Sequence, residues 1–231
     1  ITTFTVPADG SSITEVATLD HDTYGAFNFL VKMDHNTYVL IYEGSGKDIK
    51  TFAIPPDGSS ITEITFLQSD SWDSASLVKV DSDTYAMAYG AAPYNRITTY
   101  TIPADGSSIT EVASLEHDNY QSISWPNNSY DERHNTSFVK LNSKTYLLAY
   151  PGQYKSHFGQ FEISADGATI EEVGSLEHDG NLGAYYSIKA VDANTAVLAY
   201  SFKSTLQTRI KTFNLYSQDD QAPAMAVMGF S

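Results

Sequence analysis

The sequence predicts an all-β protein, a small β-propeller whose blades are four-stranded antiparallel sheets. Three observations predict this fold class: a repeat of about 50 residues, four strand-like segments in each repeat, and turn residues between the segments. Units of this kind that recur every ~40–50 residues are typical of propellers. A solenoid is the alternative, but solenoid repeats with so many strands are uncommon. The repeat is anchored by aromatic residues at Phe4, Phe52, Tyr100, Phe161 and Phe213.

Each unit is expected to contain strands that we call A, B, C and D. Strand A is centred on Leu30 in the first unit, and strand B follows it at 38–42. In the second unit, strand B carries large residues on one face and Ala86 and Ala88 on the other. Because neither face is polar, we expect both to be buried between stacked sheets. Strands A recur at Leu77, Phe138 and Ile188.

Strands C and D begin the chain, at about 1–6 and 13–19. Asp-Gly pairs join them at 9–10, 57–58, 105–106 and 166–167, which predicts tight hairpin turns with glycine at positive φ. In strand D, Ile13, Val16 and Leu19 are spaced three apart, not two. This spacing predicts a β-bulge or an outer edge strand.

The repeat units fall at about 1–48, 49–96, 97–157 and 158–209, with a partial unit at 210–231, in one predicted domain of residues 1–231. Strands A and B occur four times, whereas strand C occurs five times. We favour four blades, in which the N-terminal C–D hairpin completes the blade begun by Ile188 to Tyr200. Five blades are the alternative. The surplus C-terminal strand would then displace that hairpin, extend a partial fifth blade or pair with a neighbouring chain.

Composition excludes several classes of protein. The 231 residues include 28 acidic and 13 basic residues, a formal charge of −15, and no cysteine. A disulfide scaffold, a thiolate zinc site and a thiol enzyme are therefore excluded, and nucleic acid is not expected as a partner. The apolar runs are far shorter than the ~20 residues of a membrane span, so we expect no membrane insertion. Because the first residue is Ile1, we expect a processed chain or an excised piece.

The repeat resembles a known group of proteins. Units of the form IKTF…DG…LEHD…LVKVD…TYxLAY, with examples at Ile49 to Phe52, Leu115 to Asp118 and Leu77 to Tyr89, are similar to tandem repeats of large, uncharacterised exported bacterial proteins. The resemblance implies an extracellular or cell-surface location. It implies no activity and supplies no catalytic residues.

The D–A and B–C loops are expected at one rim of each sheet, where His-Asp pairs and aromatic residues gather. An Asp beside an aromatic face is a chemically sensible sugar subsite, so we predict a glycan or cell-surface polysaccharide as the partner. The alternative is structural: the Asp residues form Asx-turns and the aromatic residues fill gaps between blades. The predicted ligand-binding residues are His21, Asp22, Tyr24, Asp70, Trp72, Tyr94, Arg96, His117, Asp118, Tyr120, Tyr154, His178 and Asp179.

No cofactor is predicted, although calcium or a transition ion is an alternative if the His-Asp pairs converge. The pairs are separated by whole blades and show no local ligand spacing. Enzyme motifs such as Gly-x-Ser-x-Gly and His-Glu-x-x-His are absent from the sequence. The most distinctive loop is Gln121 to Thr136, with Trp125, Arg133 and glycan acceptors at Asn127 and Asn135.

The sequence therefore predicts a non-catalytic extracellular binding or adhesion module, lectin-like, that uses the D–A and B–C loops. One alternative is a structural repeat of a larger surface assembly that self-associates through a donated C-terminal strand. The other is a polysaccharide-active enzyme, because a carboxylate pair could lie among the 28 acidic residues.

Overall fold

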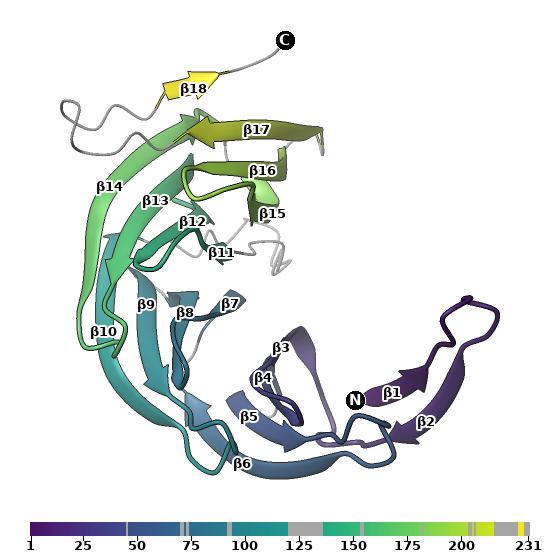
Figure 1. Ribbon diagram of the computed structural model, residues 1–231. Helices are drawn as coiled ribbons and strands as arrows, with labels where there is room; N and C mark the ends of the chain where they lie inside the picture. Colours follow the sequence, from purple (N-terminus) through teal and green to yellow (C-terminus); the bar gives the residue numbers. More distant parts are fainter. Residues whose placement is uncertain are drawn as a thin grey trace. The chain divides into compact units, whose positions relative to one another are not determined.

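All regular structure in the described part of the chain is β-strand (Figure 1). The computed structural model describes residues 1–44, 46–69, 72, 74–91, 94–119, 136–152, 155–181, 183–202, 205, 207–214 and 226–228. The distinctive loop 121–135 and the predicted site residues Asp70, Tyr120 and Tyr154 lie outside these residues. None of the described residues belongs to a helix that could span a membrane.

The strands form one two-stranded sheet and four four-stranded sheets, each with consecutive strands antiparallel and side by side. The two-stranded sheet is the hairpin of β1 (Thr2–Thr5) and β2 (Thr14–Thr18). The four-stranded sheets are β3 (Ala26–Lys32), β4 (Thr37–Glu43), β5 (Lys47–Ala53) and β6 (Thr62–Ser69); β7 (Ser74–Lys79), β8 (Thr84–Ala91), β9 (Tyr94–Thr101) and β10 (Thr110–Asn119); β11 (Ser137–Lys140), β12 (Thr145–Pro151), β13 (Ser156–Ile163) and β14 (Ile170–Asp179); and β15 (Gly183–Ala190), β16 (Thr195–Phe202), β17 (Thr208–Asn214) and β18 (Ala226–Met228). In each, the order is A, B, C, D as the sequence predicts.

The predicted closure of the last blade by the N-terminal hairpin is wrong. Strand β17 pairs along the whole length of β16, with Ala199 opposite Ile210 and Ala196 opposite Phe213. Strand β18 then pairs with β17 and supplies the fourth strand. Strands β17 and β18 at the C-terminal end of the described residues thus occupy the positions that we expected the N-terminal hairpin to occupy. Within the described residues, β1 and β2 pair only with each other.

The chain divides into two compact units, which we describe separately. The first contains residues 1–71 and 101–110, and the second contains residues 72–100 and 111–231. The prediction of a single domain stays a prediction.

Stacked sheets form the core of the second unit. Strand β11 contacts β7 and β8 on one side and β15 on the other, and every residue of β12 is buried. Ala86 and Ala88 of β8 share a cluster with Phe138 and Tyr146 of the next sheet. Small residues on one face of a B strand thus pack against large residues of the following sheet. The predicted burial of both faces is confirmed here.

The first unit also contains a core cluster. Leu40, Tyr42 and Phe52 form a cluster in sheet β3–β6, against which Ile1 and Leu19 of the N-terminal hairpin pack. The hairpin supplies only C and D strands, so it covers only part of the facing sheet. This difference creates the groove described below.

The D strands carry the predicted bulge. Between β1 and β2 the pairing passes from Thr3–Ala17 to Phe4–Glu15, so that Val16 has no direct partner. The same shift leaves out Ile64 in β6 and Val173 in β14. An extra residue in one strand explains the spacing of three, and the D strand is also the outer edge of each sheet.

The C–D connections are longer than tight hairpins, because strand pairing stops several residues before each Asp-Gly. Glycine does have positive φ in all four, from 67° at Gly10 to 74° at Gly167, as predicted. Three of these turns join neighbouring sheets through the same hydrogen bond, from a C-strand threonine to the glycine carbonyl oxygen. The three bonds are Thr3 to Gly58 at 2.8 Å, Thr51 to Gly106 at 2.7 Å and Thr99 to Gly167 at 2.7 Å.

Candidate functional site

The three histidines of the His-Asp pairs fill gaps between sheets. Each imidazole lies edge-on to the last tyrosine of the B strand in the following sheet. The ring centroids are 4.8 Å apart for His21 and Tyr42, 5.1 Å for His117 and Tyr150, and 4.9 Å for His178 and Tyr200. His117 and His178 are only 5% and 6% exposed. This burial agrees with the structural alternative, and the ligand-binding role of these two residues stays a prediction.

Burial also keeps these two histidines neutral. It lowers the pKa of His117 and of His178 to about 4. No hydrogen-bond partner for either ring nitrogen of His117 or His178 is found among the described residues. Across that part of the chain, no group of three or more His, Asp or Glu side chains could hold a metal ion.

The aspartates of the pairs fasten the D–A loops to the B strands. Asp179 Oδ2 accepts a hydrogen bond of 2.7 Å from the Tyr200 hydroxyl, and its Oδ1 accepts one of 3.1 Å from the Asn181 backbone N–H. Asp22 Oδ2 accepts a hydrogen bond of 3.1 Å from the Tyr42 hydroxyl. The second contact of Asp179 is the Asx-turn of the structural alternative. These aspartates therefore have a structural role.

Basic side chains, which are few in this acidic chain, stabilise the same loops. Lys50 donates to the backbone oxygen of His21 at 3.3 Å and pairs with Glu63 at 3.1 Å. Arg209 lies 3.1 Å from Asp179 and 4.4 Å from the centre of the Phe202 ring. Burial acts to raise the pKa of Asp179, but hydrogen bonds from Tyr200 and Asn181 and the charges of Lys211 and Arg209 favour its charged form, so its pKa stays lowered.

The other predicted residues of the second unit are placed differently. The predicted residue Asp118 has its Oδ2 atom 3.6 Å from Nδ1 of His157. Arg96 forms an ion pair with Glu116. Tyr94 is 37% exposed, at the start of β9.

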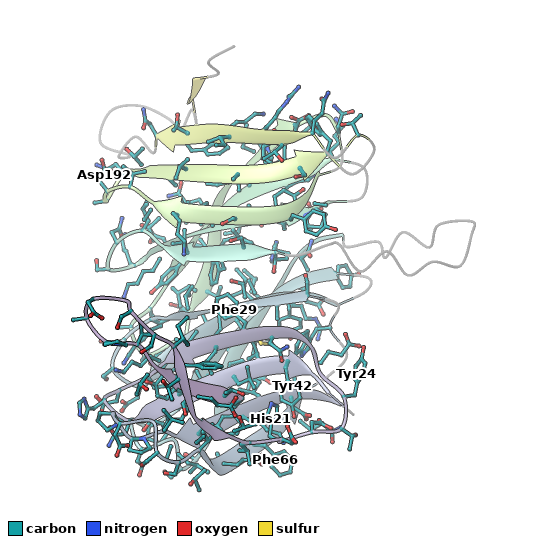
Figure 2. The ribbon with its side chains drawn as sticks, turned by 90° about the vertical axis from the view of Figure 1, so that its right-hand side faces the viewer. His21, Tyr24, Phe29, Tyr42, Phe66 and Asp192 are labelled. Carbon is teal, nitrogen blue, oxygen red and sulfur yellow. The ribbon has the colours of Figure 1, made fainter. Side chains whose placement is uncertain are left out.

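The two aromatic residues of the predicted sugar subsites differ sharply in exposure. Trp72 is completely buried and has no exposed ring face, which agrees with the structural alternative. Its role in binding stays a prediction. Tyr24 is 55% exposed in the β2–β3 loop. Figure 2 shows it near the same end of the strands as His21 and Tyr42.

An open groove of about 500 Å³ lies in the first unit, between the N-terminal hairpin and strands β3 and β4. It brings together the predicted residues His21, Asp22 and Tyr24, which we expected to share a binding rim. The full lining is Ile1, Thr2, Leu19, Asp20, His21, Asp22, Thr23, Tyr24, Gly25, Asn28, Leu30 and Leu40. We call it the Tyr24 groove.

Sequence reasoning missed Asp20, Asn28 and Leu30 in this groove. Leu30 is 49% exposed, whereas its equivalents Leu77, Phe138 and Ile188 are 2%, 5% and 2% exposed. The exposure of Leu30 has no local sequence signal, because the equivalent position is apolar in every repeat unit. Among the described residues, the two-stranded sheet β1–β2 leaves Leu30 uncovered at the groove.

Comparisons with known proteins define the fold class. No family model matches the chain, and no curated protein matches it. A solved protein from Lactobacillus plantarum matches 99% of this chain over 63% of its own length, with a TM-score of 0.69 and 12% identity. A candidate 6-phosphogluconolactonase from Bacteroides fragilis matches 97% over 62%, with a TM-score of 0.62 and 13% identity.

The NanB sialidase from Streptococcus pneumoniae also matches, with a TM-score of 0.61 and 12% identity, over 90% of this chain and 34% of the sialidase. The chain spans less than two thirds of the length of each of these proteins. They are β-propeller-type proteins, so the predicted all-β propeller class is confirmed. At these identities the likeness shows the fold alone.

Proposed function

We propose that this chain is a non-catalytic, extracellular binding module that recognises a neutral carbohydrate in the Tyr24 groove. One observation carries the proposal: an exposed tyrosine ring lies beside carboxylate and amide groups in an open groove of about 500 Å³. This volume is within the range usual for small-molecule sites. The extracellular location rests on the resemblance of the repeat to exported bacterial proteins.

The lining groups suit a sugar. An aromatic ring offers an apolar face to the C–H face of a pyranose, and the exposed ring of Tyr24 is available for that contact. Asp20 can accept hydrogen bonds from sugar hydroxyls, and Asn28 can both donate and accept them. Leu30 and Leu40 add apolar surface along the groove.

Charge favours neutral sugars over acidic ones. The chain carries a formal charge of −15, and Asp20 and Asp22 both line the groove. A uronic or sialic acid would bring its carboxylate toward these groups and be repelled. We therefore expect neutral hexoses or their polymers to bind and polyanionic polysaccharides to bind poorly.

We propose one binding groove, and not a weak site in each repeat unit. Multivalent binding around a rim requires an equivalent accessible residue in each unit, but Trp72, at the corresponding place in the second unit, is buried. Asp22 is held by Tyr42, so it supports the loop and contributes charge to the wall. Tyr24 is then the principal contact residue.

A glycan array followed by calorimetry tests the proposal. Tyr24→Ala should weaken binding of a neutral glycan about tenfold or more, because it removes the stacking surface. Phe66→Ala is the matched control, since Phe66 is 61% exposed on β6 and does not line the groove. Its affinity should equal that of the wild type.

Three outcomes would contradict parts of the proposal. Absence of binding to every glycan and polysaccharide tested would reject carbohydrate recognition. Binding that survives Tyr24→Ala but is lost in Tyr94→Ala would place the site in the β8–β9 loop. Release of shorter sugars from a bound polysaccharide would show that the module is catalytic.

A further inference from the structure

Two equivalent junctions between sheets in the second compact unit differ in the base that faces the D–A aspartate. At the first, Asp118 of β10 faces His157 of β13, with Oδ2 and Nδ1 3.6 Å apart. At the second, Asp179 of β14 faces Arg209 of β17, with Oδ2 and Nη1 3.1 Å apart. His157 and Arg209 hold the same position, directly opposite the last tyrosine of the B strand. A titratable base therefore lies at the first junction, where the second has a permanent cation.

A second basic position also differs between the two junctions. Lys211 of β17 lies 3.5 Å from Asp179 and donates to the backbone oxygen of His178. Its equivalent in β13 is Gly159, where a Cβ would lie 2.6 Å from the ring of Phe161. Because this place has no room for a lysine side chain, β13 cannot supply the cation that β17 supplies there.

Packing holds the His157 ring beside Asp118. The imidazole stacks on Tyr150, with ring centroids 5.6 Å apart and an interplanar angle of 22°. It also lies against Gly152, where a Cβ would be 2.6 Å from Nε2 of the ring, so this close approach requires glycine. The side chains of His157 and Asp118 are 25% and 33% exposed, so water and protons reach both.

Negative charge makes a cation favourable at the first junction. Burial raises the pKa of Glu172 on β14, and the charge of Asp118 raises it further. Burial and then the charge of Asp118 likewise raise the pKa of the Tyr150 hydroxyl. A positive charge beside Asp118 would offset these unfavourable interactions.

The other charged groups that face His157 are paired or neutral. Glu177 of β14 is directly opposite His157 in the strand pairing, and Lys155 lies 2.7 Å from its carboxylate. Burial lowers the pKa of His117 on β10 and of His178 on β14 to about 4. Those two imidazoles are therefore neutral from mildly acidic to alkaline pH.

We propose that His157 and Asp118 form a pH-sensitive ion pair that joins β13 to β10 and strengthens when the imidazole is protonated. The imidazolium then gives Asp118 the ion pair that Arg209 gives Asp179 at every pH. Histidine side chains ordinarily titrate at about pH 6.5. The pair therefore stabilises the folded chain in mild acid, and its contribution is lost as the pH rises through neutrality.

A double-mutant cycle at two pH values tests this proposal. The wild type, His157→Gln, Asp118→Asn and the double variant are unfolded with urea at about pH 5.5 and at about pH 8. Both substitutions keep a polar side chain and remove its charge. The coupling should change the unfolding equilibrium constant about threefold at the lower pH, as expected of partly exposed side chains, and not measurably at the higher pH.

The cycle also separates this pair from the buried imidazoles. Their acid sensitivity enters all four variants alike, so it cancels in the coupling. Circular dichroism of each variant at both pH values checks that it is folded.

His157→Arg is the matched control, because arginine occupies this position in β9 and β17, as Arg96 and Arg209. A guanidinium stays charged throughout this pH range. A second cycle, with His157→Arg in place of the wild-type histidine, should therefore show coupling to Asp118 at both pH values. High salt should weaken the coupling in both cycles.

Three outcomes would overturn the proposal. Equal coupling of His157 to Asp118 at both pH values would show that the charge of the imidazole has no part in it. Coupling in the arginine cycle alone would show that the junction accepts a cation that His157 does not provide. The absence of coupling in both cycles would show that position 157 does not interact with Asp118.

Discussion

The hydroxyl of Thr99 donates a hydrogen bond to the carbonyl oxygen of Gly167 at 2.7 Å, joining strand β9 to the turn between β13 and β14. Thr99 is fully buried, and the bond spans 68 residues of sequence. The same pairing occurs at Thr3 with Gly58 and at Thr51 with Gly106. It is the most regular polar contact between successive sheets.

Replacing Thr99 with valine should destabilise the protein by about 1–2 kcal/mol, because it keeps the side-chain volume but leaves a buried carbonyl without its donor. Thr101→Val, at an exposed position of the same strand, should change stability by less than about 0.5 kcal/mol. Urea unfolding at neutral pH measures both. Equal stabilities for the two variants would show that the bond contributes nothing.

Alanine at Gly167 should cost more than alanine at Gly10. Both glycines have positive φ, 74° and 67°, so both substitutions share a backbone cost of about 1 kcal/mol. At Gly167 the new Cβ would also lie 2.9 Å from Thr84 Cγ2, whereas at Gly10 it would meet nothing. We expect the difference to be about 1–2 kcal/mol in urea unfolding. A larger loss at Gly10 would contradict this account of the turns.

Trp72→Ala and Tyr24→Ala should have opposite effects. Trp72 is completely buried, so its truncation should reduce the free energy of unfolding by about 3–5 kcal/mol. The protein that remains folded should bind a glycan with unchanged affinity. Tyr24→Ala should leave stability nearly unchanged and weaken binding. Thermal unfolding and calorimetry on both variants separate the two roles, and loss of binding in folded Trp72→Ala would restore the tryptophan to the site.

The repeat allowed most of the fold to be predicted. Hydrophobic alternation in strands such as β8, the spacing of Val16 and the Asp-Gly turns are local signals that directly determine strands, bulges and backbone conformation. The position of β17 could not be predicted in this way. Both β1 and β17 have the pattern of a C strand, so local sequence allows either to pair with β16.

The site was harder to predict, because side-chain exposure depends on neighbours distant in the sequence. Tyr24 and Trp72 occupy corresponding loops, and both are aromatic residues close to an aspartate, yet one is exposed and the other buried. For His117 and His178 the sequence left both ligand binding and packing open. Their contacts with Tyr150 and Tyr200 favour packing.

Acid should destabilise the protein through its buried histidines. Burial lowers the pKa of His117 from 6.5 to about 4, and the nearby Asp118 only partly opposes this shift. Between these pH values the unfolded chain binds a proton that the folded chain does not, so stability falls as the pH decreases from about 6.5 toward 4. The loss should be on the order of 3 kcal/mol and nearly complete at pH 4. Urea unfolding across this range measures it.

His117→Phe should remove part of this pH dependence, because phenylalanine keeps an aromatic ring against Tyr150 and binds no proton. Its stability should therefore change less than that of the wild type between pH 6.5 and pH 4. His35→Gln is the control, since His35 is exposed in the β3–β4 turn and its replacement should leave the wild-type slope unchanged. A slope equally steep in His117→Phe would show that other groups cause the acid sensitivity. A slope lost in His35→Gln would assign it to the exposed turn.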